Sequence, residues 1–135
     1  MKVALSIGVQ KMVRSDLASA GVCFTLDPET GFENVVLITG SWGLGENVVQ
    51  GAVNPDEFYL FKTSLKNDKR SIINKKLGSK LQTMVYGTGD DNRHIIYNVE
   101  TPENKRDEFV LSDEEVTKMG KWALAIEEHY GKAMD

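Results

Sequence analysis

The sequence contains a single cysteine, and this scarcity already excludes one class of small protein. One thiol cannot form an internal disulfide framework, so the 135-residue chain is not a secreted domain of the kind that depends on such bonds. Cys23 stands between Val22 and Phe24, and this apolar setting predicts a buried, unreactive thiol. A lone cysteine also suits a reducing compartment, so we expect a cytoplasmic protein.

Long hydrophobic runs and an excess of positive charge are missing as well. No apolar run approaches the roughly 20 residues of a membrane span, and no signal-peptide pattern opens the chain. The net charge of −4 argues against a nucleic-acid binder. Apolar residues make up 41% and charged residues 27%, which is typical of globular proteins. We therefore expect a soluble protein of one domain or part of one, with no nucleic-acid and no membrane partner.

Both ends of the sequence are abrupt. A strand-like pattern begins at Lys2, and the chain stops at Asp135, just after a helical pattern. We expect the chain to be a piece of a larger protein. Such a piece would have lost partner strands, so its exposed sheet edges predict a tendency to self-associate.

Strand-like patterns occupy most of the first hundred residues. Val3, Leu5, Ile7 and Val9 alternate with smaller or polar residues, which predicts a half-buried strand. The continuous apolar run at residues 35–39 is typical of a strand buried on both faces. Further strands are predicted at residues 21–26, 57–62, 71–76, 82–86 and 94–99, with turn residues 87–92 joining the last two as a hairpin.

The end of the chain predicts an amphipathic helix. Ser112 and Glu115 have the spacing of a capping box. Apolar residues then recur at steps of three and four, and Gly131 supplies a stop. The predicted class is α+β, with strands first and a helix last.

A cluster of glycines, Gly40, Gly43 and Gly45, has two possible interpretations. Closely spaced glycines let backbone N–H groups approach an anion, but the spacing matches neither known phosphate-loop fingerprint. A structural turn and a ligand-facing loop both remain open. Glu46, which follows, could bind a metal, interact with a helix dipole or remain a solvated charge.

The remaining polar residues give no catalytic pattern. His94 and His129 are the only histidines, no zinc spacing exists, and nothing supports a Cys–His nucleophile pair. A basic stretch is predicted to be a solvated face; it consists of Lys62, Lys66, Lys69, Arg70, Lys75, Lys76 and Lys80.

Three blocks of sequence resemble the phosphoenolpyruvate synthase family. They are residues 9–13 (Val-Gln-Lys-Met-Val), residues 20–25 (Ala-Gly-Val-Cys-Phe-Thr) and residues 41–59, which begin Ser-Trp-Gly-Leu-Gly-Glu-Asn. The third block is long and highly specific. The resemblance continues through Gly-Ser-Lys at residues 78–80 to His-Tyr-Gly at residues 129–131, so it covers nearly the whole chain.

The resemblance implies that residues 1–135 are a single fragment of an ATP-binding domain. That domain has an ATP-grasp fold, here expected as a mixed or antiparallel sheet with a C-terminal helix. The family converts pyruvate, ATP and water into phosphoenolpyruvate, AMP and phosphate, with Mg²⁺ at the nucleotide and a phosphohistidine on another domain of the same chain. The implied ligands are thus ATP, Mg²⁺ and, in the full enzyme, pyruvate.

The resemblance carries only a few site residues onto this chain. Gln10, Lys11, Met12 and Val13 are expected to contact adenine, Gln10 by its side chain and the others by their backbone. Asp135 matches a metal-binding aspartate of the family. No catalytic residue is implied, because the family's other phosphate- and metal-binding residues have no match here, so the fragment alone should be inactive. Two alternatives remain: a related phosphotransferase with another acceptor, and a non-catalytic nucleotide-binding module.

Overall fold

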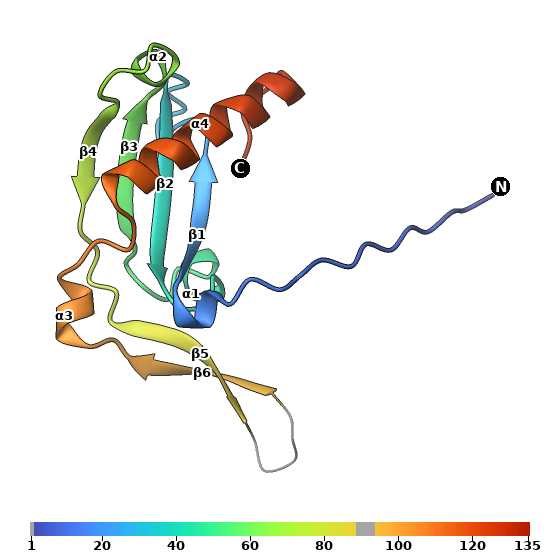
Figure 1. Cartoon of the computed structure of the whole chain (residues 1–135), viewed down its shortest axis with the longest axis vertical. Coiled ribbons are helices and arrows are strands. Elements are labelled where there is room, and N and C mark those ends of the chain that lie inside the picture. The colour runs from blue at the N-terminus through green and yellow to red at the C-terminus, as the bar shows by residue number, and fades with distance from the viewer. Residues whose placement is uncertain (1, 89–93) are drawn as a thin grey trace.

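The computed structural model describes residues 2–88 and 94–135, and it contains a sheet, a long helix and a separate hairpin (Figure 1). A four-stranded sheet has the order β1-β2-β3-β4, and β5 and β6 form a two-stranded ribbon. The strands are β1 (Ser19–Phe24), β2 (Val35–Trp42), β3 (Asp56–Phe61), β4 (Ile72–Lys76), β5 (Gln82–Thr88) and β6 (His94–Glu100). The helices are the 3-10 turn η1 (Ser15–Leu17), α1 (Glu46–Val49), α2 (Lys62–Lys66), α3 (Glu103–Arg106) and α4 (Asp113–Tyr130).

Every strand pair of the large sheet is antiparallel, and β2 lies at its centre. Ile38 of β2 is opposite Cys23 on β1 and Phe58 on β3, so these three side chains share a face. Seven of the eight residues of β2 are buried. This agrees with the continuous apolar run at residues 35–39, because a central strand that is covered on both faces has no solvent-exposed side that would favour polar residues.

Helix α4 crosses one face of the sheet and closes the hydrophobic core (Figure 1). Val116 and Ala123 of α4 pack in one cluster with Leu60 and Leu65. A Cβ atom at Gly120 would lie 2.9 Å from Leu60 Cδ2, so the missing side chain lets the helix approach the sheet closely. Each large apolar side chain buried in this way contributes about 1.5–3 kcal/mol to folding.

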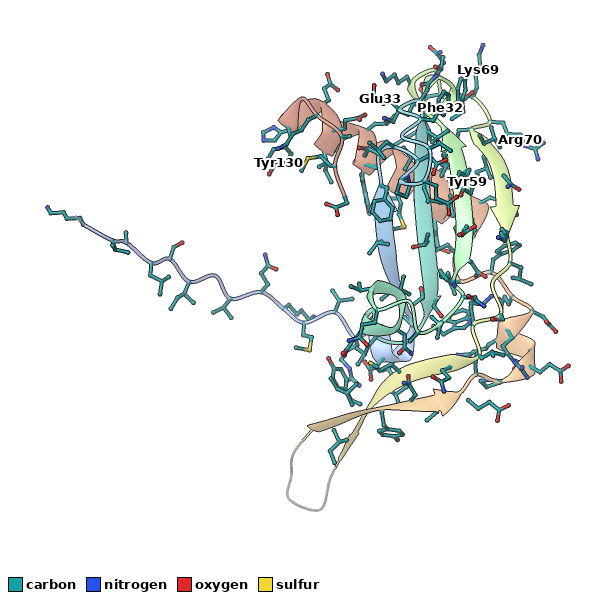
Figure 2. The ribbon with its side chains drawn as sticks, turned by 180° about the vertical axis from the view of Figure 1, so that it is seen from behind. Phe32, Glu33, Tyr59, Lys69, Arg70 and Tyr130 are labelled. Atoms are coloured by element: carbon teal, nitrogen blue, oxygen red, sulfur yellow. The ribbon has the colours of Figure 1, made fainter. Side chains whose placement is uncertain are left out.

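The opposite face of the sheet is more open. Tyr59 alternates with Phe58 and Leu60, so it points away from α4. Viewed from that side, Tyr59 lies on the sheet near Phe32 and Glu33, while Lys69 and Arg70 project outward beyond β4 (Figure 2).

The β5–β6 hairpin projects from the body (Figure 1), and contacts from both of its strands join it to the rest of the chain. Met84 of β5 forms a parallel bridge with Gly43, and its carbonyl accepts a hydrogen bond from the Leu44 N–H at 2.9 Å. The buried amide of Asn47 donates to Asn98 Oδ1 on β6 at 2.7 Å. A two-stranded ribbon is only marginally stable alone, so these contacts hold it in place.

Most of the predicted elements are confirmed. All six strands from residue 19 onward form, and the hairpin pairing of β5 with β6 is confirmed; part of its predicted turn lies outside the described residues. The α+β class with an antiparallel sheet and a C-terminal helix is therefore correct. None of the helices in the described residues is long and apolar enough to cross a membrane.

The strand predicted at the start of the chain is wrong. Residues 2–14 run extended from η1 and pair with no strand in the described parts of the chain. Val3, Leu5, Ile7 and Val9 are 84–94% exposed. The alternation shows that the segment could form a strand, but a strand also needs a neighbour to take its backbone hydrogen bonds.

The predicted capping of α4 is confirmed in detail. Ser112 Oγ accepts from the Glu115 N–H, and Glu115 Oε1 accepts from the Ser112 N–H, both at 3.2 Å. These hydrogen bonds hold the pKa of Glu115 below its usual value. At the other end Gly131 adopts φ +68°, and its N–H donates to the carbonyl of Glu127.

The serine cap can be tested by a matched pair of substitutions. We expect Ser112→Ala to lower the free energy of unfolding by about 1 kcal/mol, because a helix-end N–H loses its acceptor. Ser112→Asp should stay close to the unchanged chain, since a carboxylate caps equally well. Urea unfolding followed by circular dichroism measures both, and equal loss in the two variants would contradict a capping role.

Candidate functional site

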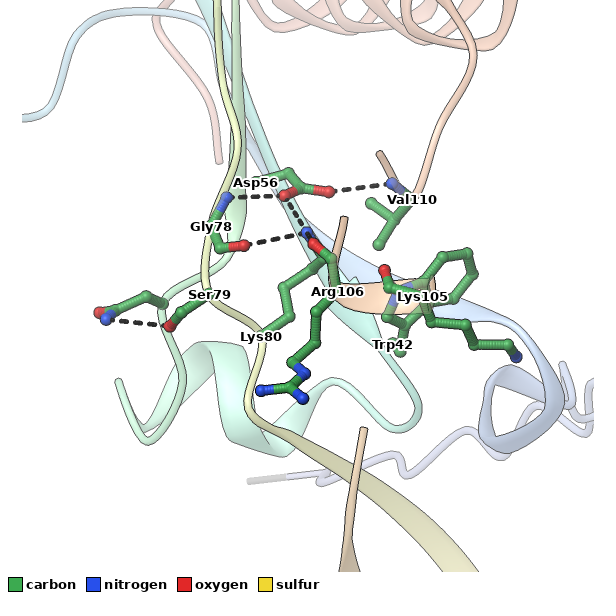
Figure 3. Close-up of polar contacts among 9 residues, drawn as sticks. Trp42, Asp56, Gly78, Ser79, Lys80, Lys105, Arg106 and Val110 are labelled. Atoms are coloured by element: carbon green, nitrogen blue, oxygen red, sulfur yellow. Dashed lines mark hydrogen bonds and ion pairs between the residues drawn. The ribbon is translucent and has the colours of Figure 1, made fainter. Parts of the chain in front are cut away.

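A fully buried ion pair lies where four segments of the chain meet (Figure 3). Lys80 Nζ and Asp56 Oδ1 are 2.5 Å apart, and both side chains are 0% exposed. Asp56 also accepts from the N–H groups of Gly78 and Val110, at 2.8 and 2.9 Å. Lys80 donates further to the carbonyls of Gly78 and Arg106, at 3.0 and 3.1 Å. The two charged groups therefore share five hydrogen bonds.

The hydrogen bonds of this network hold separate segments of the chain together and leave no group of the pair to bind a ligand. It ties the start of β3 to the loop at residues 78–80, to the end of α3 and to the segment leading into α4. The three donor positions of the Lys80 ammonium are occupied by protein acceptors. Lys80 is therefore a structural cation.

The basic stretch is only partly the solvated face that was predicted. Lys66, Lys69, Arg70, Lys75 and Lys76 are exposed. Lys80 is buried in the network, and Lys62 is buried against Glu127 of α4, with Nζ and Oε1 2.9 Å apart. The prediction fails for these two lysines because each is paired with an acid distant in sequence, which composition does not reveal.

The glycine cluster forms a structural junction. Gly43 has φ +87°, its N–H donates to the carbonyl of Ala18 at 3.0 Å, and the next N–H, of Leu44, donates to Met84. Gly45 precedes the short helix α1. The backbone N–H groups of residues 43 and 44 thus donate to Ala18, just before β1, and to Met84 of β5, which supports the structural turn over the anion loop.

Glu46 is exposed and stands in the first turn of α1. Its Oε1 accepts from Gln50 Nε2 at 2.8 Å, one turn along the helix. No group of three or more possible metal ligands occurs within residues 2–88 and 94–135. Glu46 is therefore placed as a solvated helix-start carboxylate.

The residues expected at adenine lie on the exposed arm at the start of the chain. All four, Gln10 to Val13, are exposed. The Tyr86 hydroxyl donates to Met12 Sδ at 3.8 Å, and the Val13 carbonyl accepts from Ser15 at 3.0 Å. The arm is anchored at its end, where Arg14 forms two hydrogen bonds of 2.8 and 2.7 Å with Asp16. That contact lowers the pKa of Asp16.

Asp135 lies at a groove between β1 and α4. The groove has a volume of about 390 Å³, and apart from Thr25 and Asp135 its walls are Gly21, Val22, Cys23, Phe24, Met119, Trp122, Ala123, Ile126 and Met134. Met134 holds the chain end there: its carbonyl accepts from the Thr25 N–H, and its N–H donates to Thr25 Oγ1 at 2.7 Å. Asp135 is itself exposed.

The structure does not bring the two predicted contact regions together. Residues 10–13 precede the start of β1, whereas Asp135 lies near Thr25, just past its end. The two regions thus lie near opposite ends of β1, and a strand of six residues spans about 20 Å. As a metal ligand Asp135 fits Mg²⁺ in one respect: the ion needs only one or two carboxylates when substrate phosphates complete its shell.

Cys23 and the histidines form no catalytic pair. Burial raises the pKa of the Cys23 thiol to about 11, and the side chain is half-buried against the core. His129 is exposed and packs edge-on against Tyr130, with ring centroids 4.9 Å apart. The side chain of His94 lies outside the described residues. The predicted unreactive thiol agrees with this environment, although burial is incomplete.

Comparison with known proteins gives a consistent result over the full length. Residues 1–135 match the pyruvate phosphate dikinase, AMP/ATP-binding domain family. Proteins named phosphoenolpyruvate synthase are 53% identical in Neisseria meningitidis serogroup B over 133 residues, 55% in Synechocystis over 128 and 52% in Escherichia coli K12 over 133. These alignments cover 95–98% of this chain but only 15–17% of each relative.

The buried ion pair gives a sharp stability prediction. Lys80→Ala should lower the free energy of unfolding by about 3–5 kcal/mol, because Asp56 is left buried without its cation. Lys76→Ala is the control: Lys76 pairs with Glu57 at 3.9 Å and is 72% exposed, so its loss should cost below about 0.5 kcal/mol. Urea unfolding compares the two. The double variant Asp56→Asn/Lys80→Met should recover part of the loss, and equal effects of the two alanines would contradict the assignment.

The thiol of Cys23 should react slowly while the protein is folded. With its pKa raised to about 11, the thiolate fraction at pH 8 is about a hundredfold below that of the unfolded chain. Labelling with a chromogenic disulfide should therefore be slow in buffer and fast in urea, and its rate should rise with pH up to about 11. A fast folded-state reaction at pH 8 would contradict the burial.

Proposed function

The chain belongs to the pyruvate phosphate dikinase AMP/ATP-binding domain family, and we propose that it is part of an enzyme that makes phosphoenolpyruvate from pyruvate, ATP and water. The observation that carries the proposal is identity above 50% over nearly the whole chain to relatives named phosphoenolpyruvate synthase. In this proposal the phosphoryl group passes through a phosphohistidine on another domain of the same chain. The enzyme would be cytoplasmic, in keeping with a lone, unpaired cysteine.

We assign the ATP-grasp fold to the complete domain on the same basis. Such a domain holds its nucleotide between the sheets of two α+β subdomains. The antiparallel sheet of this chain, with α4 on one face and the more open face around Tyr59 on the other, supports one such subdomain (Figure 2). The second subdomain would come from chain outside these residues.

Adenine is proposed to bind along residues 10–13. An extended backbone presents N–H and C=O groups in alternation along its edge, which is the pattern a base edge requires. The Gln10 amide adds a donor and an acceptor. The exposure of Gln10, Lys11, Met12 and Val13 supports this role, because nucleotide could reach them without displacing packed side chains.

Asp135 is proposed to hold Mg²⁺ together with the phosphates of ATP. Its exposure supports access by the ion. The bonds between Met134 and Thr25 support a fixed position for its backbone. Bound Mg²⁺ would offset the negative charge of the phosphates. A single carboxylate gives weak binding of the ion alone, so metal and nucleotide should bind together.

An amide-resolved NMR titration tests the adenine site. Mg-ATP and AMP should both shift the backbone signals of residues 10–13, because both carry adenine, and only Mg-ATP should shift Asp135. Gln10→Ala should weaken binding of both nucleotides, whereas substituting Gln50, an exposed glutamine directly after α1, by alanine should not. Shifts confined to other residues would contradict the assignment.

The proposed reaction is tested in the longer enzyme. The full-length enzyme should convert ATP to AMP and phosphate continuously only when pyruvate is present, and without pyruvate it should stop after one phosphohistidine has formed per active site. Gln10→Ala should raise the KM for ATP and leave the KM for pyruvate unchanged. ATP consumption that responds to a different acceptor would overturn the reaction while leaving the nucleotide site intact.

A further inference from the structure

The segment that joins α4 to Asp135 is held at both of its ends. Gly131 closes the helix with φ +68°, and this left-handed conformation turns the backbone out of the helical path. The segment then returns toward the end of β1 (Figure 1), where Met134 meets Thr25, the residue directly after that strand. Asp135 is the next residue, so its position relative to the sheet is set at Met134.

Thr25 forms three hydrogen bonds with Met134, and two of them need its hydroxyl. The Thr25 N–H donates to the Met134 carbonyl at 2.9 Å. The hydroxyl oxygen Oγ1 accepts from the Met134 N–H at 2.7 Å and donates to the same carbonyl at 3.2 Å. The N–H and the carbonyl of Met134 are thus both bound by one residue, which fixes the direction in which its backbone continues.

The Thr25 side chain is buried, which makes it a rigid support. It is only 2% exposed, although threonine side chains are mostly exposed in proteins. Water therefore does not compete for the two hydroxyl bonds, and losing them would leave buried polar groups unpaired. The branched side chain also restricts χ1, so the hydroxyl has few other orientations. Further segments of a longer chain can only add to this burial.

Within residues 2–88 and 94–135, the backbone of residues 132–135 forms hydrogen bonds with Thr25 alone. The Asp135 carboxylate therefore lies one residue away from a single anchoring side chain. Its position depends directly on the Thr25 hydroxyl, because nothing else in the described chain binds this backbone.

We propose that Thr25 is a positioning residue for the metal site, and that its hydroxyl holds the backbone at Met134 so that the Asp135 carboxylate meets Mg²⁺ in one place. The inference rests on the proposed role of Asp135. Carboxylate oxygens suit Mg²⁺, and this ion demands near-ideal octahedral geometry. A carboxylate on a wandering backbone would bind it less well. Partners that orient a metal ligand typically contribute roughly 10–100-fold to metal affinity.

A purely structural role for Thr25 predicts a different result. If the contact only attaches the segment after α4 to β1, removing the hydroxyl should lower thermal stability and leave the metal and adenine sites equally affected. A positioning role acts on the metal alone, because residues 10–13 precede the start of β1 and Thr25 follows its end.

Manganese binding to the full-length enzyme separates the two roles. Mn²⁺ accepts the same oxygen ligands as Mg²⁺, and its free fraction is read from the electron paramagnetic resonance signal of the aqueous ion. The nucleotide is α,β-methylene-ATP, whose α–β bond cannot be cleaved, so binding is measured without turnover. Binding of AMP without metal, followed by calorimetry, reports on the adenine site and on correct folding.

The matched substitutions differ in the hydroxyl. Thr25→Val keeps the shape of the side chain and should raise the dissociation constant of Mn²⁺ about tenfold. Thr25→Ser keeps the hydroxyl and should stay within about twofold. Thr25→Ala also lacks the hydroxyl and should behave like Thr25→Val, so the test does not depend on one variant. AMP binding should stay within about twofold in all three.

Two further variants serve as controls. Thr101→Val removes the hydroxyl of a fully buried threonine that is hydrogen-bonded to Thr83 at 2.7 Å, directly after β6, and should leave manganese binding unchanged. Asp135→Asn should weaken manganese binding at least as much as Thr25→Val. If Asp135→Asn has no effect, the metal role and the positioning role both fall. If it weakens binding while Thr25→Val and Thr25→Ala do not, or if these two weaken AMP binding equally, the positioning role alone is overturned.

Discussion

Two opposite charges withdrawn completely from water, Asp56 and Lys80, are the constraint on which the arrangement of this chain depends. Removing charges from solvent is expensive, and the cost is recovered only when the pair and its surroundings satisfy every donor and acceptor position. Here the partners come from β3, the loop at residues 78–80, α3 and the segment before α4. None of these segments can shift alone without leaving a charge unpaired. The pair therefore fixes how the second half of the chain returns across the first.

The surrounding residues reinforce the same junction. A Cβ atom at Gly78 would collide with the backbone of Asn54 and Pro55, so only glycine lets the two loops touch. Trp42, at the end of β2, donates its indole N–H to the carbonyl of Lys105 at 2.8 Å, and the Lys105 ammonium lies 5.0 Å from the indole ring (Figure 3). The glycine turn at residue 43 then attaches the hairpin on the same side of the molecule. The glycine-rich segment at residues 40–45, which is typical of a binding loop, here connects parts of the fold.

Patterns with a local cause were predictable from the sequence, and those with a distant cause were not. The cap at Ser112 and the buried strand β2 each depend on neighbours within a few residues or on one hydrophobic run, and both were foreseen. The burial of Lys80 depends on Asp56, 24 residues earlier, and no local pattern links two residues so far apart. The signal that could have found it is the glycine before an isolated lysine in Gly-Ser-Lys. For the candidate site, the resemblance supplied residues 10–13 and Asp135, and no spacing rule could have done so.

The misassigned first strand shows why alternation alone is incomplete information. Alternation specifies which side of a segment will be buried, but the backbone of that segment must also find donors and acceptors. In the described chain each strand from β1 to β6 has such a neighbour, whereas the arm has apolar side chains and a basic charge but no adjacent edge. A period-two pattern therefore identifies a segment that is able to form a strand, and the presence of a neighbouring strand decides whether it does.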